Sequence, residues 1–161
     1  SMVAKGRPIY NGQINAHGQM YVVRDEYFEP AFGHLAEKGL AALKNKSRLG
    51  RPTLLETHRS NFVDDPDVAE AAINELERLL EEAIKRFTML RFMSTAELVR
   101  AFVAVDREIL EMGFMPRMHV YLLRLGQVPG FWKLAWLSGA IIPAGLLYML
   151  SRPFYKYQGA A

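Results

Sequence analysis

The sequence predicts an α/β fold with parallel strands, followed by a hydrophobic helical tail. Short β-branched or apolar runs alternate with amphipathic stretches up to about residue 112, which is typical of parallel strands joined by helical crossovers. Charged residues are dense over 25–107, whereas 131–151 contains Lys133 as its only charge. Half of the 161 residues are apolar, which is enough for one domain core.

The first strand and helix are predicted over residues 20–50. Residues 20–24 (MYVVR) form a β-branched and aromatic run that predicts a strand. Pro30 suits the first turn of the helix that follows, because proline lacks the N–H that would be unsatisfied there. Gly50 ends this helix or begins the next turn. Its apolar face would consist of Phe32, Leu35, Leu40 and Leu43.

The second half of the predicted α/β region contains two more strands and two more helices. Residues 52–58 (PTLLETH) predict the second strand, and Asp65-Pro66-Asp67 opens a long amphipathic helix that ends near Phe87. Residues 89–93 (MLRFM) predict a third strand, and the capping box of Ser94-Thr95-Ala96-Glu97 opens a helix through about residue 112. Three parallel strands make an incomplete layer, so we expect the chain to lack strands that a complete domain has.

The tail predicts contact with a membrane. Residues 113–130 predict an amphipathic linker helix that could lie at the interface, and 131–161 predict a transmembrane helix with a short basic tail. Aromatic residues lie near the ends of the apolar run, as in an aromatic belt: Trp132, Trp136, Tyr148, Tyr155 and Tyr157. Two alternatives are a helical hairpin packed on the rest of the protein or on a partner, and an oligomer interface in water.

Charge and composition exclude several classes of function. The formal net charge is +3, and the basic residues are scattered among 17 acids, so we expect no nucleic-acid partner. The absence of cysteine excludes disulfides, thiolate metal sites and a cysteine nucleophile. The histidines outside the second strand lack the paired spacing of metal ligands, and we predict no metal site within this chain: His17, His34 and His119.

Polar side chains follow the first two predicted strands. The first strand ends at Arg24-Asp25-Glu26, with Glu29 before Pro30, and the second ends at Thr57-His58-Arg59, with Asn61 beyond. Ligands of parallel α/β folds bind at the C-terminal ends of strands. Histidine titrates near neutrality and can act as a general acid, and arginine can bind an anion. We therefore predict His58 as the catalytic residue. The predicted substrate-binding residues are Arg24, Glu29, Thr57, Arg59 and Asn61.

Structural interpretations of the same residues remain open. His58 could be a hydrogen-bonded structural residue, and Arg24 with Glu29 could be an ion pair that fixes the loop to the helix. The acidic group before the long helix is most simply a helix cap and its dipole complement, not a metal site: Asp64, Asp65 and Asp67.

The segments GQMYVVRDEYFEPAF, GRPTLLETHRSNFV and RFMSTAEL, with their order and spacing, resemble the C-terminal half of polysaccharide deacetylase-like proteins. These proteins belong to the glycoside hydrolase/deacetylase β/α-barrel superfamily, and the similarity covers roughly residues 10–99. The resemblance implies a partial β/α barrel over 1–112 that acts on carbohydrate at the cell envelope. In true deacetylases early strands supply an aspartate and two histidines to a metal, and a late histidine helps protonate the leaving group. His58 matches the late histidine, whereas the early motifs are absent, so a divalent metal is expected only in a longer parent protein.

These observations lead to two hypotheses of different classes. The first is the C-terminal portion of a membrane-associated carbohydrate deacetylase or hydrolase-like enzyme that cleaves an acyl or glycosidic bond of a cell-envelope glycan. The second is a non-catalytic, membrane-anchored α/β module that binds a glycan or a protein partner.

Overall fold

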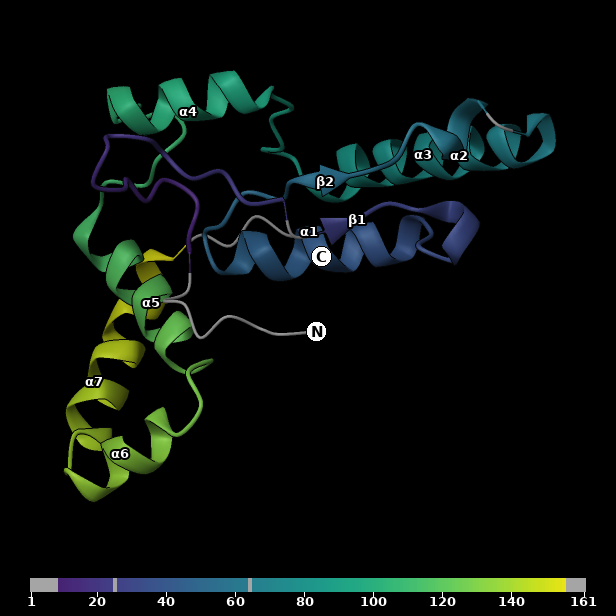
Figure 1. The fold of residues 1–161 in the computed structure, drawn as a ribbon. Helices are drawn as coiled ribbons and strands as arrows, with labels where there is room; N and C mark the ends of the chain where they lie inside the picture. The colour runs from purple at the N-terminus through teal and green to yellow at the C-terminus, as the bar shows by residue number, and fades with distance from the viewer. Residues whose placement is uncertain (1–8, 25, 64, 156–161) are drawn as a thin grey trace.

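The computed structural model describes residues 9–24, 26–63 and 65–155, and it is mostly helical. Two short strands, β1 (Glu26–Tyr27) and β2 (Leu55–Glu56), pair in parallel with Glu26 opposite Leu55. The helices, in chain order, are η1 (Pro30–Phe32), α1 (Ala36–Arg48), α2 (Ser60–Val63), α3 (Pro66–Arg86), α4 (Thr95–Ala104), α5 (Phe114–Leu125), α6 (Phe131–Leu137), α7 (Ile141–Ser151) and η2 (Arg152–Phe154), where η1 and η2 are 3₁₀ helices. Figure 1 shows α1 and α3 side by side, and α5, α6 and α7 together in a separate part of the molecule.

The predicted partial β/α barrel is wrong. Residues 20–24 form no strand and contribute only an isolated antiparallel bridge between Met20 and Ile14. Residues 89–93 are also outside any strand, and Met89 and Phe92 are exposed. In the described residues, the sheet is the β1–β2 pair alone. A short apolar run becomes a strand only when it finds a partner, and these two runs have none that extends a sheet.

Two predicted helices begin where their capping residues lie in the sequence. The long helix is confirmed as α3: Asp65 accepts hydrogen bonds from the backbone N–H groups of Asp67 and Val68, and Pro66 begins the helix. The capping box at the start of α4 is confirmed, but α4 ends at Ala104, earlier than predicted, because Val105 turns left-handed with φ 50°. These two helices carry their start signals in sequence.

The helix predicted after Pro30 is divided in two. Pro30 begins the single turn η1, and Gly33 ends it in the left-handed region at φ 76°. The main helix α1 then begins at Ala36. Proline therefore marks a helix start correctly, but glycine shortens that helix to one turn.

The core of the first part of the chain lies between α1 and α3. Its buried residues are Phe28, Ala36, Leu40, Leu79 and Ala83. Gly39 allows the two helices to approach closely, because a Cβ atom on this residue would lie 2.9 Å from Cδ1 of Leu79. This packing fixes the loops that follow β1 and β2, since β1 leads directly into Phe28 and α2 leads into α3.

A second packing unit joins α5 to α7 and η2. His119 of α5 is buried there, with its ring stacked on Tyr148 and Tyr155 at centroid distances of 4.6 and 4.8 Å. Its Nδ1 lies 3.1 Å from Oγ of Ser151. His119, for which the sequence predicts no role, therefore packs at the centre of the α5–α7 interface.

Hydrogen bonds connect the second unit to the end of α1. The guanidinium group of Arg124 donates to the carbonyls of Leu49 and Gly50, each at 2.7 Å. The hydroxyl of Tyr155 donates to the carbonyl of Arg48 at 2.6 Å. These bonds satisfy carbonyl groups at the C-terminal end of α1, where helix carbonyls lack intrahelical partners.

The tail predicted as one hydrophobic helix over 131–161 is divided into α6, α7 and η2. Gly139 has φ 73° and separates α6 from α7. In the described residues no single helix is long and apolar enough to cross a membrane; Phe131–Leu137 and Ile141–Phe154 meet the length and composition criteria only as a pair bent by 118°. Tyr157, one of the predicted belt residues, lies outside the described residues. The amphipathic linker helix, by contrast, is present as α5.

Candidate functional site

The parallel pairing of β1 and β2 brings two polar loops together. Glu29 follows β1, and His58 and Asn61 follow β2. Because both strands run in the same direction, their C-terminal ends meet at one edge of the sheet. The first strand of this pair is not the predicted one: β1 lies at Glu26–Tyr27, whereas residues 20–24 form no strand.

The carboxylate of Glu29 is the centre of the cluster. Its Oε1 accepts hydrogen bonds from Nδ1 of His58 at 2.6 Å and from the backbone N–H of His58 at 3.0 Å. Its Oε2 accepts a hydrogen bond from the side-chain amide of Asn61. Only 6% of the Glu29 side chain is exposed, against 65% of the His58 side chain. The acid is thus buried beneath an accessible imidazole.

Electrostatics favour an ionised Glu29. Burial raises the pKa of this carboxyl, but hydrogen bonds from Asn61 and His58 and the attraction of His58 outweigh it, leaving the pKa below its usual value. An ionised carboxylate can only accept hydrogen bonds, so Nδ1 of His58 carries the proton in this contact. In the neutral imidazole, Nε2 is then the acceptor, which is the arrangement of a carboxylate-oriented general base.

Asn61 connects the cluster to the backbone of both loops. Its side-chain amide also donates to the carbonyl of His58 at 3.1 Å, and its Oδ1 accepts from the N–H of Ala31 at 3.4 Å. Asn61 is fully buried. Each polar atom of this amide side chain therefore has a partner, as buried polar groups require. The same bonds that orient His58 also hold the two loops together.

The other predicted site residues lie around this cluster. Arg24 pairs with Glu56 of β2, with Nη2 3.6 Å from Oε1, in place of the Arg24–Glu29 pair considered from the sequence. Thr57 and Arg59 are exposed on either side of His58. Sequence reasoning missed Glu56 as the partner of Arg24. The available signal was its position directly before Thr57 in the second predicted strand.

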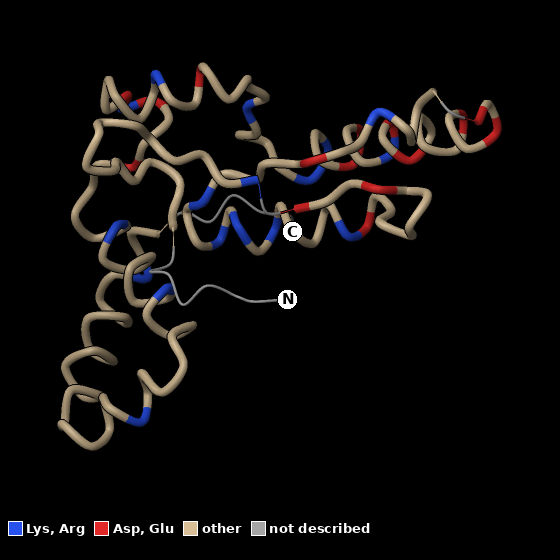
Figure 2. The backbone as a smooth tube through the Cα atoms, viewed as in Figure 1, with Lys and Arg blue, Asp and Glu red and all other residues tan. Residues whose placement is uncertain are grey.

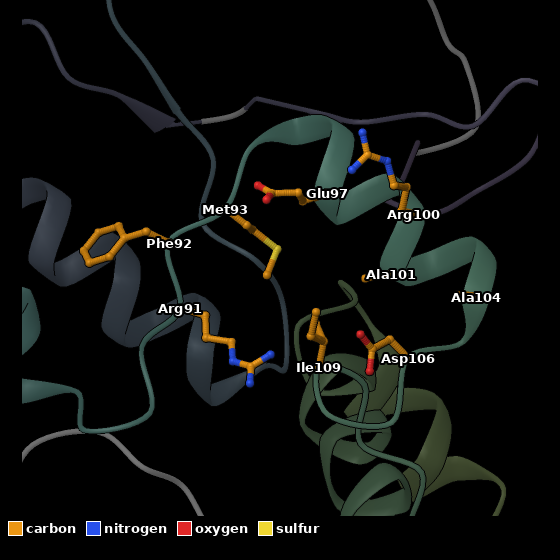
Figure 3. Close-up of a pocket in the computed structure, with 9 residues that line it drawn as sticks. All are labelled: Arg91, Phe92, Met93, Glu97, Arg100, Ala101, Ala104, Asp106 and Ile109. Atoms are coloured by element: carbon orange, nitrogen blue, oxygen red, sulfur yellow. The ribbon is translucent and has the colours of Figure 1, made fainter.

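A separate cavity of about 580 Å³ lies between the segment before α4, α4 itself and the turn after it. Figure 3 shows Met93, Asp106 and Ile109 around this space, while the ring of Phe92 points away. Its charged groups are partly engaged: Arg91 pairs with Glu108 at 3.2 Å, and Glu97 caps α4. None of the residues predicted for the site lines this cavity.

The described residues do not fit a metal site. In residues 9–24, 26–63 and 65–155, no three His, Asp or Glu side chains could hold a metal ion together. Both carboxylate oxygens of Glu29 are occupied by hydrogen bonds from His58 and Asn61. The arrangement can hold and move a proton at His58.

No protein-family model, curated protein or solved structure matches this chain.

Proposed function

We propose that the chain carries the acid–base site of a hydrolase that acts on carbohydrate, with His58 as the catalytic residue. The observation that supports the proposal is the contact between the buried Glu29 carboxylate and Nδ1 of the exposed His58. A carboxylate in this position fixes the tautomer and orientation of an imidazole and stabilises its protonated form. Glu29 is a positioning residue in this proposal, and Asn61 holds Glu29.

In the proposed reaction, water cleaves an acyl or glycosidic bond of a cell-envelope glycan. His58 delivers a proton to the leaving group, or takes one from the attacking water, through Nε2. The exposed Thr57 and Arg59 lie next to His58 in the chain and supply hydroxyl and guanidinium groups suited to sugar hydroxyls or a carboxylate. The resemblance to polysaccharide deacetylase-like proteins supports carbohydrate as the substrate class.

The test is hydrolysis of acetylated oligosaccharides, measured as acetate release. We expect His58→Ala to lower turnover by about a hundredfold or more, since a positioned acid–base group contributes ~10²–10⁴ in rate. His17→Ala is the matched control, because His17 is exposed in an N-terminal loop and is expected to leave turnover unchanged. Unchanged turnover in His58→Ala would remove this residue from the mechanism.

A second variant tests the positioning role. Glu29→Gln keeps the shape of the side chain but removes its negative charge. It also replaces one of the two oxygens that accept hydrogen bonds with an NH₂ group, which donates them. We expect turnover to fall and the pH profile of turnover to move, because the imidazole loses its negative partner. A purely structural Glu29 would lower the thermal midpoint without moving that pH profile.

The alternative function is a non-catalytic module that binds a glycan or a protein partner. The observation in its favour is that the Glu29–His58–Asn61 bonds reach the backbone of His58 and Ala31, so the cluster also has a structural use. This alternative predicts no acetate release from the wild-type chain, with or without added divalent cations. It also predicts that Arg59→Ala weakens binding of the glycan in calorimetry.

A further inference from the structure

The helix pair α6–α7 leaves nearly all of its apolar side chains uncovered. Both helices are fully described, and their only buried residues are Ala135 and Ser151. We call 131–151, comprising α6, α7 and the turn between them, the apolar hairpin. Its large exposed side chains are Trp132, Leu134, Trp136, Leu137, Ile142, Leu146, Leu147, Tyr148, Met149 and Leu150. An exposed apolar surface of this kind marks a contact with a protein or a membrane.

The charge around the apolar hairpin is of one sign. The sequence has no acidic residue after Glu111, while its last 50 residues contain five basic ones: Arg117, Arg124, Lys133, Arg152 and Lys156. Residues 1–111 contain 17 acidic and 15 basic residues. Figure 2 shows basic residues but no acidic ones in the part of the molecule formed by α5, α6 and α7. The whole chain is nearly balanced, but the hairpin end is cationic.

This charge pattern distinguishes between possible occupants of the surface. A second copy packed hairpin to hairpin would bring the same positive charges together without any acid between them. A bilayer with anionic headgroups supplies apolar volume and negative charge at once. Trp132 and Trp136 add amphipathic rings of the type enriched at the membrane interface.

The lengths of the helices determine how deep such a contact can reach. At 1.5 Å per residue, α6 is about 10 Å long and α7 about 16 Å long, whereas the hydrocarbon core of a bilayer is about 30 Å thick. The left-handed turn at Gly139 bends the pair instead of joining it into one rod. We propose that the apolar hairpin docks into one leaflet of an anionic membrane, lying at the boundary of headgroups and acyl chains without crossing the bilayer.

This inference is independent of the proposed hydrolase function, because its test measures no activity. Both tryptophans of the chain lie in α6, so intrinsic fluorescence reports on the hairpin directly. The full chain is titrated with phosphatidylcholine vesicles, with and without about 30% phosphatidylserine, a fraction that gives a strong negative surface potential. We expect a blue shift and flotation with the anionic vesicles, both weakened by salt.

Matched variants locate the contact. Leu137→Glu on α6 is expected to weaken partitioning at least about tenfold, because it places a charge in the apolar layer. Val103→Glu on α4 is the control, since both side chains are similarly exposed, at 72% and 69%. Lys133→Gln and Arg152→Gln are each expected to weaken partitioning about fivefold, since one basic residue near an anionic surface contributes ~1 kcal/mol.

Three results would overturn the proposal. Equal partitioning into neutral and anionic vesicles would remove the anionic surface as the partner. A stable oligomer in lipid-free buffer, with tryptophan emission already blue-shifted and no flotation, would assign the hairpin to contacts between copies. Tryptophan quenching that is strongest with bromine at the bilayer centre would show crossing, whereas docking in one leaflet predicts stronger quenching by bromine near the headgroups.

Discussion

The two packing units of this chain use apolar residues in opposite ways. In the first unit, α3 has an apolar stripe and a charged face, and it buries Leu79 and Ala83 in the core that it forms with α1. Other apolar side chains of α3 stay exposed: Val68, Ile73, Leu80 and Ile84. In the second unit, α7 is apolar almost all round and buries only Ser151. An amphipathic helix completes its packing within its own domain, whereas an all-apolar helix needs a second apolar surface. The first unit therefore has a buried core of large side chains, whereas α7 leaves most of its apolar side chains uncovered.

The largest expected effect comes from a matched pair of leucine truncations. Leu79 is 3% exposed in the α1–α3 core, and Leu137 is 72% exposed on α6. We expect Leu79→Ala to lower the free energy of unfolding by about 2–5 kcal/mol, because it removes buried methyl groups and leaves a cavity. Leu137→Ala should change it by less than about 0.5 kcal/mol in lipid-free buffer. Urea unfolding followed by circular dichroism measures both.

The outcome of that pair decides how different the two units are. Similar losses of unfolding free energy in both variants would mean that the apolar hairpin is already covered in solution. The two units would then not differ in how they bury their apolar residues. With anionic vesicles present, Leu137→Ala is expected to weaken vesicle binding while Leu79→Ala acts on folding alone.

A smaller effect is expected at the connection between the units. Arg124→Met keeps most of the aliphatic stem but removes the hydrogen bonds to the carbonyls of Leu49 and Gly50. We expect a loss of about 1–3 kcal/mol, as for hydrogen bonds made by a charged donor. Arg107→Met is the control, since Arg107 is exposed in the turn after α4.

Hydrogen exchange should then show α5 opening at lower free energy than α3 in the Arg124 variant. Equal protection of α5 and α3 would show that other contacts couple the units.

The sequence predicted the features with local signals. Asp65 and Pro66 marked the start of α3, and the Ser94–Glu97 capping box marked the start of α4. His58 and Glu29 were both singled out from the sequence, but the strand that brings them together, β1 at Glu26–Tyr27, was not predicted. The two helix starts depend on a few adjacent residues.

The features that depend on distant partners were not predicted. Residues 20–24 and 89–93 have strand-like composition, but a strand also needs a neighbour that the sequence does not specify. The bend at Gly139 was missed because glycine populates positive and negative φ equally well. Likewise, nothing near His119 in the chain indicates its stack with Tyr148 and Tyr155.

The smallest expected effect is a pH dependence confined to the second unit. Burial lowers the pKa of His119, a backbone hydrogen bond at Tyr148 opposes this shift, and repulsion from Arg152 adds to it. The neutral imidazole is therefore the form that packs in the folded state. An unfolded histidine has a pKa of about 6.5, so the unfolded chain binds the proton first as the pH falls. The stability contributed by neutral His119 is present above pH ~6.5 and is lost as the pH falls toward its folded-state pKa.

The measurement is the free energy of urea unfolding between pH 7.5 and pH 5 in the wild type and in His119→Phe. Phenylalanine keeps an aromatic ring between Tyr148 and Tyr155 but cannot be protonated, so the variant is expected to lose part of the decline on acidification. His17→Gln is the control and should keep the wild-type slope, because His17 is exposed.

Glu29 does not interfere in this window: its pKa is lowered, so its contribution is lost only below about pH 4.5. The same slope in His119→Phe and wild type would show that protonation of His119 does not loosen the α5–α7 packing, and the two units would then share one response to acid.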